Sequence, residues 1–143
     1  SKSRGSLTGF LICNHPEKYN FIDHYIPIIV GPEVISGSTR MKSGTATKLV
    51  LNMISTTCMI QLNKVYKNYM VDLKVVNNKL KNRAILIINQ LTDLNVSNSE
   101  ELLNSADGEV KTAIVMYKLK VDYIKAKQII DNNQGSLVKI IDT

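Results

Sequence analysis

Apolar residues in the first third of the chain fall into two short runs. Leu7–Cys13 and Tyr25–Val30 are largely apolar rather than alternating with polar residues. This pattern is typical of strands that are buried on both faces of a parallel sheet. Pro27 lies inside the second run. Because proline donates no ladder hydrogen bond, it predicts an edge position or an irregular end for that strand.

Helical spacing begins further along. Gly44–Lys64 carries apolar side chains on several sides, which predicts a buried helix. We expect its apolar partners, and the rest of the sheet, to lie outside this chain, because two parallel strands alone leave both edges open. A second helix is predicted over Asp72–Leu94, with Asp72 as its N-cap. Its apolar stripe comprises Leu73, Val76, Leu80, Ala84, Ile87 and Leu91.

The last part of the chain contains a weak internal repeat. Gly108 and Gly135 are 27 residues apart (135 − 108), and similar apolar residues flank both. Each glycine is predicted at the C′ position of a short helix that a second helix follows. The two units, Ser97–Leu119 and Val121–Ile141, predict a small helical bundle. It resembles the ubiquitin-associated fold, although a generic helical hairpin fits the same pattern and no ubiquitin binding is expected.

Composition adds little to this picture. The 143 residues are 44% apolar and 21% charged, as in an ordinary globular protein. The net charge of +6 favours anionic partners, and its densest cluster is Lys79, Lys81 and Arg83. We interpret that cluster as a solvated helix face rather than a nucleic-acid contact, because no recognised module accompanies it. No signal peptide or membrane-length apolar run is recognised, so we expect a cytoplasmic protein.

Two cysteines and two histidines give no basis for a disulfide framework or a metal centre. Cys13 and Cys58 are predicted to be buried free thiols. Cys13 and His15 lie close in the sequence, but nothing near them completes a zinc set. No metal and no cofactor are expected.

The loop Gly31–Ser43 is the segment most suited to ligand chemistry. It leads from a predicted strand into a helix N-terminus, where free N–H groups attract anions. Hydroxyl and cationic side chains accompany it: Ser38, Thr39, Arg40, Lys42, Ser43 and Thr45. The residue types alone leave two interpretations open, an anion site and ordinary helix capping in which Arg40 pairs with Glu33. The loop lacks the GxxxxGK[ST] pattern of a nucleotide-binding P-loop.

The run Gly31–Lys48, with the sequence GPEVISGSTRMKSGTATK, is similar to the signature of the N-acetylmuramic acid 6-phosphate etherase and glucokinase regulatory protein family. The similarity continues through Leu49–Met53, Lys64–Asp72, Asn77–Leu80 and Lys111–Met116. Ser43 stands where alanine is common in the family, and Thr47 where glutamine is common. The extension through the C-terminal helices favours the etherase.

The resemblance implies an α/β fold with two parts. Residues 1–70 would form the C-terminal part of a parallel-sheet sugar isomerase domain, and residues 71–143 a small helical domain similar to the ubiquitin-associated fold. It also implies cleavage of the lactyl ether of N-acetylmuramic acid 6-phosphate, giving N-acetylglucosamine 6-phosphate and D-lactate. The reaction resembles elimination followed by addition of water, with carboxylates as acid and base.

The catalytic glutamates of the family lie in its N-terminal half, so no residue of this chain is assigned a catalytic role, and the chain alone is expected to be inactive. The residues expected to bind substrate are Glu33, Ser38, Thr39, Arg40 and Lys42. Implied partners are a phosphorylated amino sugar and either a second copy of the protein or the N-terminal half, with no nucleic acid and no membrane. The alternatives are a phosphosugar-binding regulator without turnover and a basic nucleic-acid-binding module.

Overall fold

A computed structural model describes residues 2–142 of the chain. It contains two compact units, one reaching to Thr56 and one beginning at Thr57, within a long helix.

The first unit contains a short 3-10 helix, Lys2–Arg4, and two strands. Strands β1 (Gly9–Ile12) and β2 (His24–Pro27) pair in parallel, with Gly9 opposite His24 and Ile12 opposite Pro27. Both strands are shorter than their apolar runs predict. Pro27 is the last residue of β2, in keeping with its inability to donate to a ladder.

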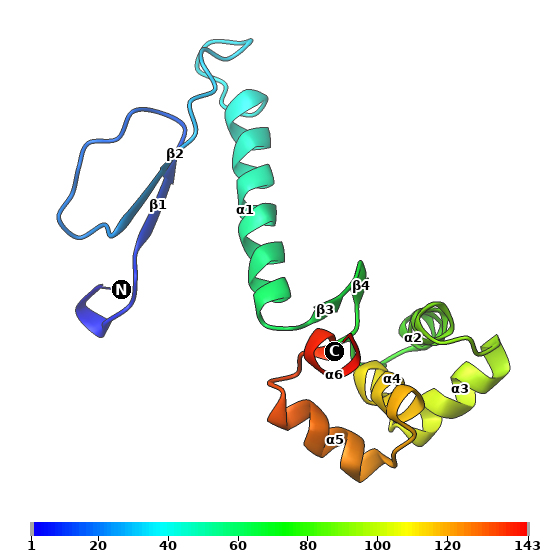
Figure 1. Cartoon of the computed structure of the whole chain (residues 1–143). Helices are drawn as coiled ribbons and strands as arrows, with labels where there is room; N and C mark the ends of the chain where they lie inside the picture. Colours follow the sequence, from blue (N-terminus) through cyan, green and yellow to red (C-terminus); the bar gives the residue numbers. More distant parts are fainter. Residues whose placement is uncertain (1, 143) are drawn as a thin grey trace. The chain divides into compact units, whose positions relative to one another are not determined.

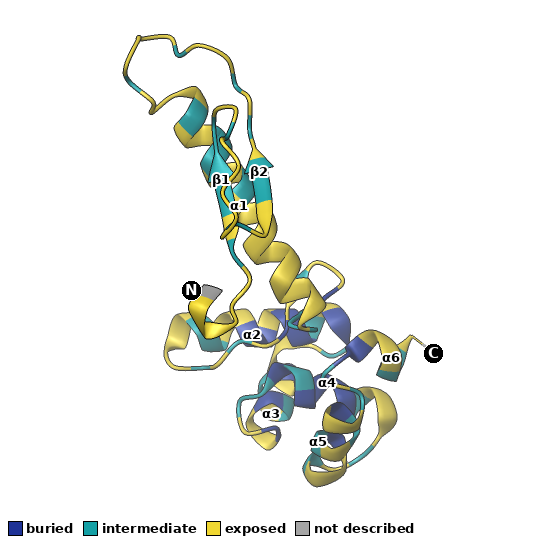
Figure 2. Cartoon of the chain, turned by 90° about the vertical axis from the view of Figure 1, so that its left-hand side faces the viewer, coloured by how far each residue is buried: buried dark blue, intermediate teal, exposed yellow. Residues whose placement is uncertain are grey.

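Helix α1 (Lys42–Gln61) is the predicted long helix, starting and ending slightly earlier than expected. None of its residues is buried, so the predicted burial is not reached within the part of the chain that the structure describes (Figure 2). Its exposed apolar side chains are Leu49, Leu51, Met53, Ile54, Met59 and Ile60. Two residues after the end of α1, Asn63 has a φ of 56° that reverses the backbone, and its N–H donates to Ile60 O at 2.9 Å.

In the second unit, the last turn of α1 is followed by a β-hairpin that the sequence pattern did not reveal. Strands β3 (Val65–Tyr66) and β4 (Tyr69–Met70) pair antiparallel. Lys67 in the turn has a φ of 53°. Two residues a strand are too few to show a period, so only the tertiary structure reveals this hairpin.

Helix α2 (Asn78–Leu91) starts six residues later than predicted, and its N-cap is Asn77 rather than Asp72 (78 − 72). The Asn77 side chain accepts a hydrogen bond from Leu80 N at 2.9 Å. The prediction of Asp72 was wrong because its carboxylate pairs with Lys64 and the preceding Val71 is buried in the core. Leu73 and Val76 therefore precede the helix instead of belonging to its stripe.

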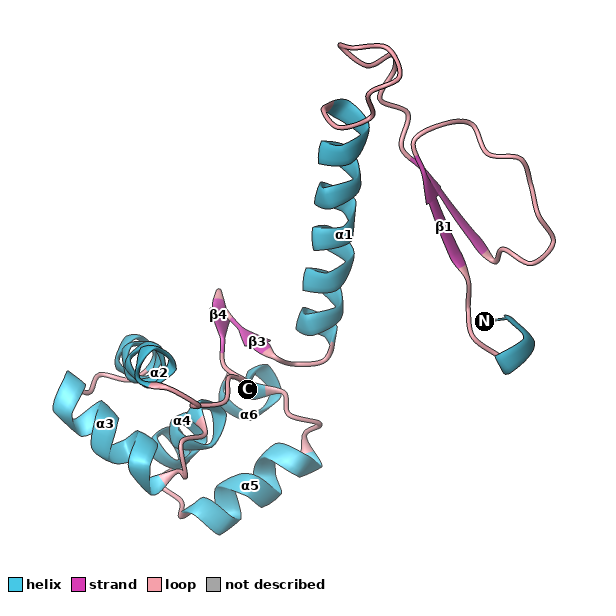
Figure 3. Cartoon of the chain, turned by 180° about the vertical axis from the view of Figure 1, so that it is seen from behind, coloured by secondary structure: helices cyan, strands magenta, loops and turns pink. Residues whose placement is uncertain are grey.

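Four further helices complete the unit: α3 (Val96–Ser105), α4 (Val110–Leu119), α5 (Tyr123–Asn132) and α6 (Leu137–Ile141). Helix α4 lies centrally and contacts α2, α3, α5 and α6 (Figures 1 and 3). Its apolar residues Ala113, Ile114 and Val115 are fully buried. The core also receives Tyr66 and Val71 from the hairpin segment, so the hairpin is part of this unit.

The internal repeat is visible in the caps as well as in the sequence. Asn95 and Asp122, 27 residues apart (122 − 95), each cap a helix by accepting from the backbone N–H three residues on. Gly108 N donates to Leu103 O at 3.0 Å, and Gly135 N donates to Ile130 O at 2.8 Å. Both glycines have a φ of 74°, but each stands at C″, because Asp107 and Gln134 occupy C′ with left-handed backbones. The predicted C′ position was therefore one residue too early.

Candidate functional site

Glu33 holds the start of α1. Its Oε2 accepts a hydrogen bond from Lys42 N and its Oε1 accepts one from Ser43 N, each at 3.0 Å. These hydrogen bonds lower the pKa of the Glu33 carboxyl below its ordinary value of 4.5, and the Lys42 N–H has a larger effect than the Ser43 N–H. Lys42 Nζ in turn donates to Pro32 O at 2.8 Å. Glu33 and Lys42 thus close the loop Gly31–Met41 onto the first turn of α1.

Arg40 takes no part in this closure. Its side chain is exposed, and within residues 2–142 it makes neither a hydrogen bond nor an ion pair. The predicted alternative of a structural clamp between Arg40 and Glu33 is therefore absent from this structure. The guanidinium remains available for a ligand.

A cavity of about 590 Å³ lies where the two parallel strands end. Cys13 and Asn14 follow β1, and Ile29, Gly31 and Pro32 follow β2. Thr39, in the loop before α1, and Ser43, in the first turn of α1, also line it. Ligands of parallel α/β sheets bind at the carboxyl ends of strands, and this cavity occupies that position.

Small residues and short contacts shape the wall of the cavity. Cys13 Sγ lies 3.4 Å from Thr47 Oγ1 and 3.7 Å from Ser43 O, which ties β1 to α1. Gly44 N donates to Thr39 O at 3.1 Å. Asn14 and Thr39 are the exposed polar residues among those that line the cavity.

The structure brings only part of the predicted set together. Thr39 lines the cavity, whereas Glu33 and Lys42 brace its rim through the Pro32 carbonyl and the first turn of α1. Ser38 is half-buried, and its N–H donates to Ile35 O at 3.0 Å. Arg40 is exposed beside Thr39 in the sequence but does not line the cavity.

Sequence reasoning missed Cys13 and Asn14 as lining residues. Their place directly after a predicted parallel strand was a signal that could have indicated them. Cys58 also departs from the expectation of two buried thiols, because it is exposed and Cys13 is half-buried.

A second cavity, of about 450 Å³, lies in the helical unit. Its charged side chains are largely bonded to one another. Lys127 Nζ donates to both oxygens of Glu109 at 2.9 Å, and Thr112 Oγ1 donates to Glu109 Oε2 at 2.6 Å. Burial raises the pKa of Glu109, but the hydrogen bonds from Thr112 and Lys127 outweigh it and leave that pKa lowered.

Within residues 2–142, no three His, Cys, Asp or Glu side chains gather in a way that could hold a metal ion. None of the helices described there has both the length and the apolar character needed to cross a membrane.

Comparison with known proteins first gives the class. Residues 67–109, from the hairpin to the start of α4, match the family model described as the C-terminal lid domain of glucokinase regulatory protein. This match falls within the helical unit.

Comparison with curated proteins then gives individual relatives. The chain is 44% identical to N-acetylmuramic acid 6-phosphate etherase 1 of Bacillus licheniformis over 142 residues, which is 99% of this chain and 47% of that protein. It is 47% identical to the etherase of Bacillus subtilis over 96% of the chain and 46% of the relative. It is 54% identical to the etherase of Petrotoga mobilis over 74% of the chain and 36% of the relative.

Over nearly its whole length the chain is similar to N-acetylmuramic acid 6-phosphate etherases. It spans about half the length of the curated relatives it matches and corresponds to their C-terminal half.

Proposed function

We propose that this chain is the C-terminal half of an etherase, a carbon–oxygen lyase that cleaves the lactyl ether of N-acetylmuramic acid 6-phosphate. The products would be N-acetylglucosamine 6-phosphate and D-lactate, as in the cytoplasmic recycling of cell-wall sugars. The observation that carries this proposal is the 41–54% identity to etherases across both units of the chain. The cavity at the strand ends supports it, because it lies where parallel α/β proteins bind ligands.

In this proposal the chain binds and orients the phosphosugar and supplies neither the acid nor the base. Thr39 offers a hydroxyl inside the cavity, and Arg40 offers a guanidinium that is suited to a phosphate or carboxylate. Glu33 and Lys42 contribute to substrate binding indirectly, because their hydrogen bonds fix the conformation of the loop. Ser38 stays in the proposed set as a hydroxyl of the same loop.

The division into domains is also part of the proposal. We assign residues 1–70 to the end of a parallel-sheet sugar isomerase domain and residues 71–143 to a helical domain that resembles the ubiquitin-associated fold. The compact units divide earlier, at Thr56, since Tyr66 of the hairpin packs into the helical core. The exposed apolar side chains of α1 favour an N-terminal half, or a second copy in a homodimer, as its partner.

The test is release of D-lactate from N-acetylmuramic acid 6-phosphate. The 143-residue chain alone should release none. A fusion in which the N-terminal half of the Bacillus subtilis etherase precedes Ser1 should restore turnover. Turnover by the isolated chain, or a folded fusion that binds the substrate without releasing lactate, would contradict the proposal.

The second of these outcomes would favour the other candidate, a phosphosugar-binding regulator. The match of residues 67–109 to the lid domain of glucokinase regulatory protein is the observation in its favour. Binding without turnover by the fusion would distinguish it from the etherase.

A further inference from the structure

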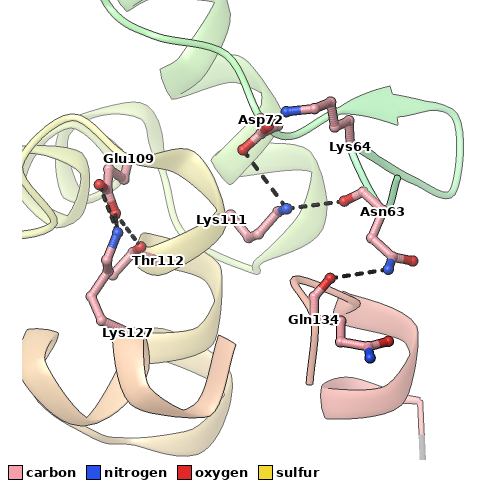
Figure 4. A network of polar contacts seen from close by, with 8 residues as sticks. All are labelled: Asn63, Lys64, Asp72, Glu109, Lys111, Thr112, Lys127 and Gln134. Atoms are coloured by element: carbon pink, nitrogen blue, oxygen red, sulfur yellow. Dashed lines mark hydrogen bonds and ion pairs between the residues drawn. The ribbon is translucent and has the colours of Figure 1, made fainter. Parts of the chain in front are cut away.

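The segment Asn63–Asp72, which follows α1, is fastened to both helical repeats by polar contacts (Figure 4). Lys111 Nζ, from α4, donates to Asn63 O at 2.9 Å and lies 3.8 Å from Asp72 Oδ1. Lys64 pairs with the same Asp72 carboxylate. Asn63 Nδ2 donates to Gln134 O, in the turn between α5 and α6, at 3.1 Å. We call the segment Asn63–Asp72, which these contacts hold, the joint.

The backbone is shaped to bring these groups together. Asn63 and Gln134 both have left-handed conformations, with φ values of 56° and 55°. A Cβ atom built on Gly135 would lie only 3.2 Å from Lys111 Nζ, so the ammonium group lies directly over the Gly135 backbone. The contacts of Asn63 span 48 residues to Lys111 and 71 residues to Gln134. They therefore connect the end of α1 to two separate parts of the helical unit.

Burial distinguishes Lys111 from Lys127, another lysine that lines the 450 Å³ cavity of the helical unit. Its side chain is only 12% exposed, whereas the side chains of Lys127 and Glu109 are both 39% exposed. Burial lowers the pKa of Lys111, and the neighbouring Asp72 carboxylate opposes that shift. A buried ammonium group needs partners to remain charged, and the joint supplies them in the Asn63 carbonyl and Asp72. An exposed pair such as Lys127–Glu109 contributes far less.

We propose that Lys111 is a positioning residue that holds Asn63–Asp72 rigidly against α4 and the turn between α5 and α6, within the helical unit, rather than leaving it a flexible linker. The joint itself does not depend on the proposed activity.

Hydrogen exchange of backbone amides in the 143-residue chain tests the joint. In Lys111→Met, which keeps the length of the side chain but not its charge, amides of Asn63–Asp72 should exchange about ten- to a hundredfold faster. That range corresponds to a hydrogen bond to a charged group. Amides of α2 and α4 should keep their protection, and Lys111→Arg should restore part of it in the joint. The matched control, Lys127→Met, should leave Asn63–Asp72 unchanged.

Two outcomes would overturn the proposal: unchanged exchange in Asn63–Asp72, or an equal rise in the joint and in the core helices, which would mean global destabilisation. Asp72→Asn provides a second and milder variant, because it keeps the shape of the side chain and removes its charge. In Asp72→Asn, the substitution should also speed the exchange of amides in Asn63–Asp72 more than the exchange of amides in α4. A folded Asp72→Asn protein with wild-type exchange in the joint would count against the proposal even where Lys111→Met does not fold.

Discussion

At the scale of single residues, the structure separates side chains that build the loop from those left free for a ligand. Both carboxylate oxygens of Glu33 accept hydrogen bonds from the backbone of α1, and Lys42 Nζ donates one to Pro32 O. Arg40 makes no such bond within the described residues. It is therefore the side chain of the predicted set whose loss should affect binding more than folding.

We predict that Arg40→Ala in the active fusion lowers kcat/KM about ten- to a hundredfold, because a hydrogen bond to a charged group contributes roughly 1.5–3 kcal/mol. The melting temperature should stay close to that of the unsubstituted fusion. Lys48→Ala, an exposed cation on α1, is the matched control and should retain normal kinetics. An early-melting Arg40→Ala protein with normal kinetics in its folded fraction would assign Arg40 a structural role instead.

A second residue stands out inside the helical core. Ser99 is 0% exposed, and its hydroxyl has no hydrogen-bond partner among the residues that the structure describes. At the same place in the second repeat, 27 residues on (126 − 99), stands Ala126, which is also 0% exposed. Since an unsatisfied buried hydroxyl costs about 1–3 kcal/mol, Ser99→Ala should raise the free energy of unfolding by about 1 kcal/mol.

Urea denaturation of the two proteins measures this change. Ser105→Ala is a suitable control, because the Ser105 hydroxyl is exposed and already bonded to Leu102 O. Destabilisation by Ser99→Ala would show that the hydroxyl has a partner in solution.

At the scale of elements, the start of α1 depends on a single carboxylate. The pKa of Glu33 is lowered on folding, so its contribution to stability is present above its ordinary value of 4.5 and is lost as the pH falls through the lower folded value. The same contacts position the loop Gly31–Met41. Its conformation should therefore change in acid before the rest of α1 melts.

We expect the amide resonances of Lys42 and Ser43 to shift in an NMR titration, with a midpoint below pH 4.5. In Glu33→Gln the same two amides should show no such transition, since glutamine does not titrate. An unchanged titration in Glu33→Gln would mean that another group controls the start of α1.

At the scale of the whole molecule, the two units differ in how complete they are. The helical unit has a continuous core that includes Ile88, Leu103 and Ile114. In the first unit α1 has no buried residue and the sheet has two strands (Figure 2). Small sheets of this kind are not independently stable in water. The helical unit should therefore fold alone, while the first unit needs a partner.

Limited proteolysis should cut before Thr57 and leave a resistant fragment that contains the hairpin and all the later helices. A fragment that starts at Asp72 should be less stable, because it lacks Tyr66 and Val71, which are 5% and 1% exposed in the core. Thermal unfolding of the two fragments measures the difference. A stable monomer of residues 1–56 with protected strand amides would contradict this view of the first unit.

What the sequence determined by itself was local. The spacing of apolar residues and glycines over a few positions predicted the helix–glycine–helix repeats and the long helix after the loop. The family signature was found by direct resemblance. Asn95, Gly108, Asp122 and Gly135 act in the structure through hydrogen bonds to residues near them in the chain. Such short-range contacts carry a small entropic cost of loop closure, and they can be expected from pattern alone.

The tertiary structure decided the features that need partners far along the chain. Helix α2 begins at Asn78 instead of the predicted Asp72, because the Asp72 carboxylate pairs with Lys64 and Lys111. The tertiary structure also formed a hairpin too short for any period to show. The cavity lined by Cys13, Asn14 and Thr39 exists only because the ends of two strands lie near the start of a helix. Their separations in sequence exceed any local pattern, so only the packing of the elements could bring them together.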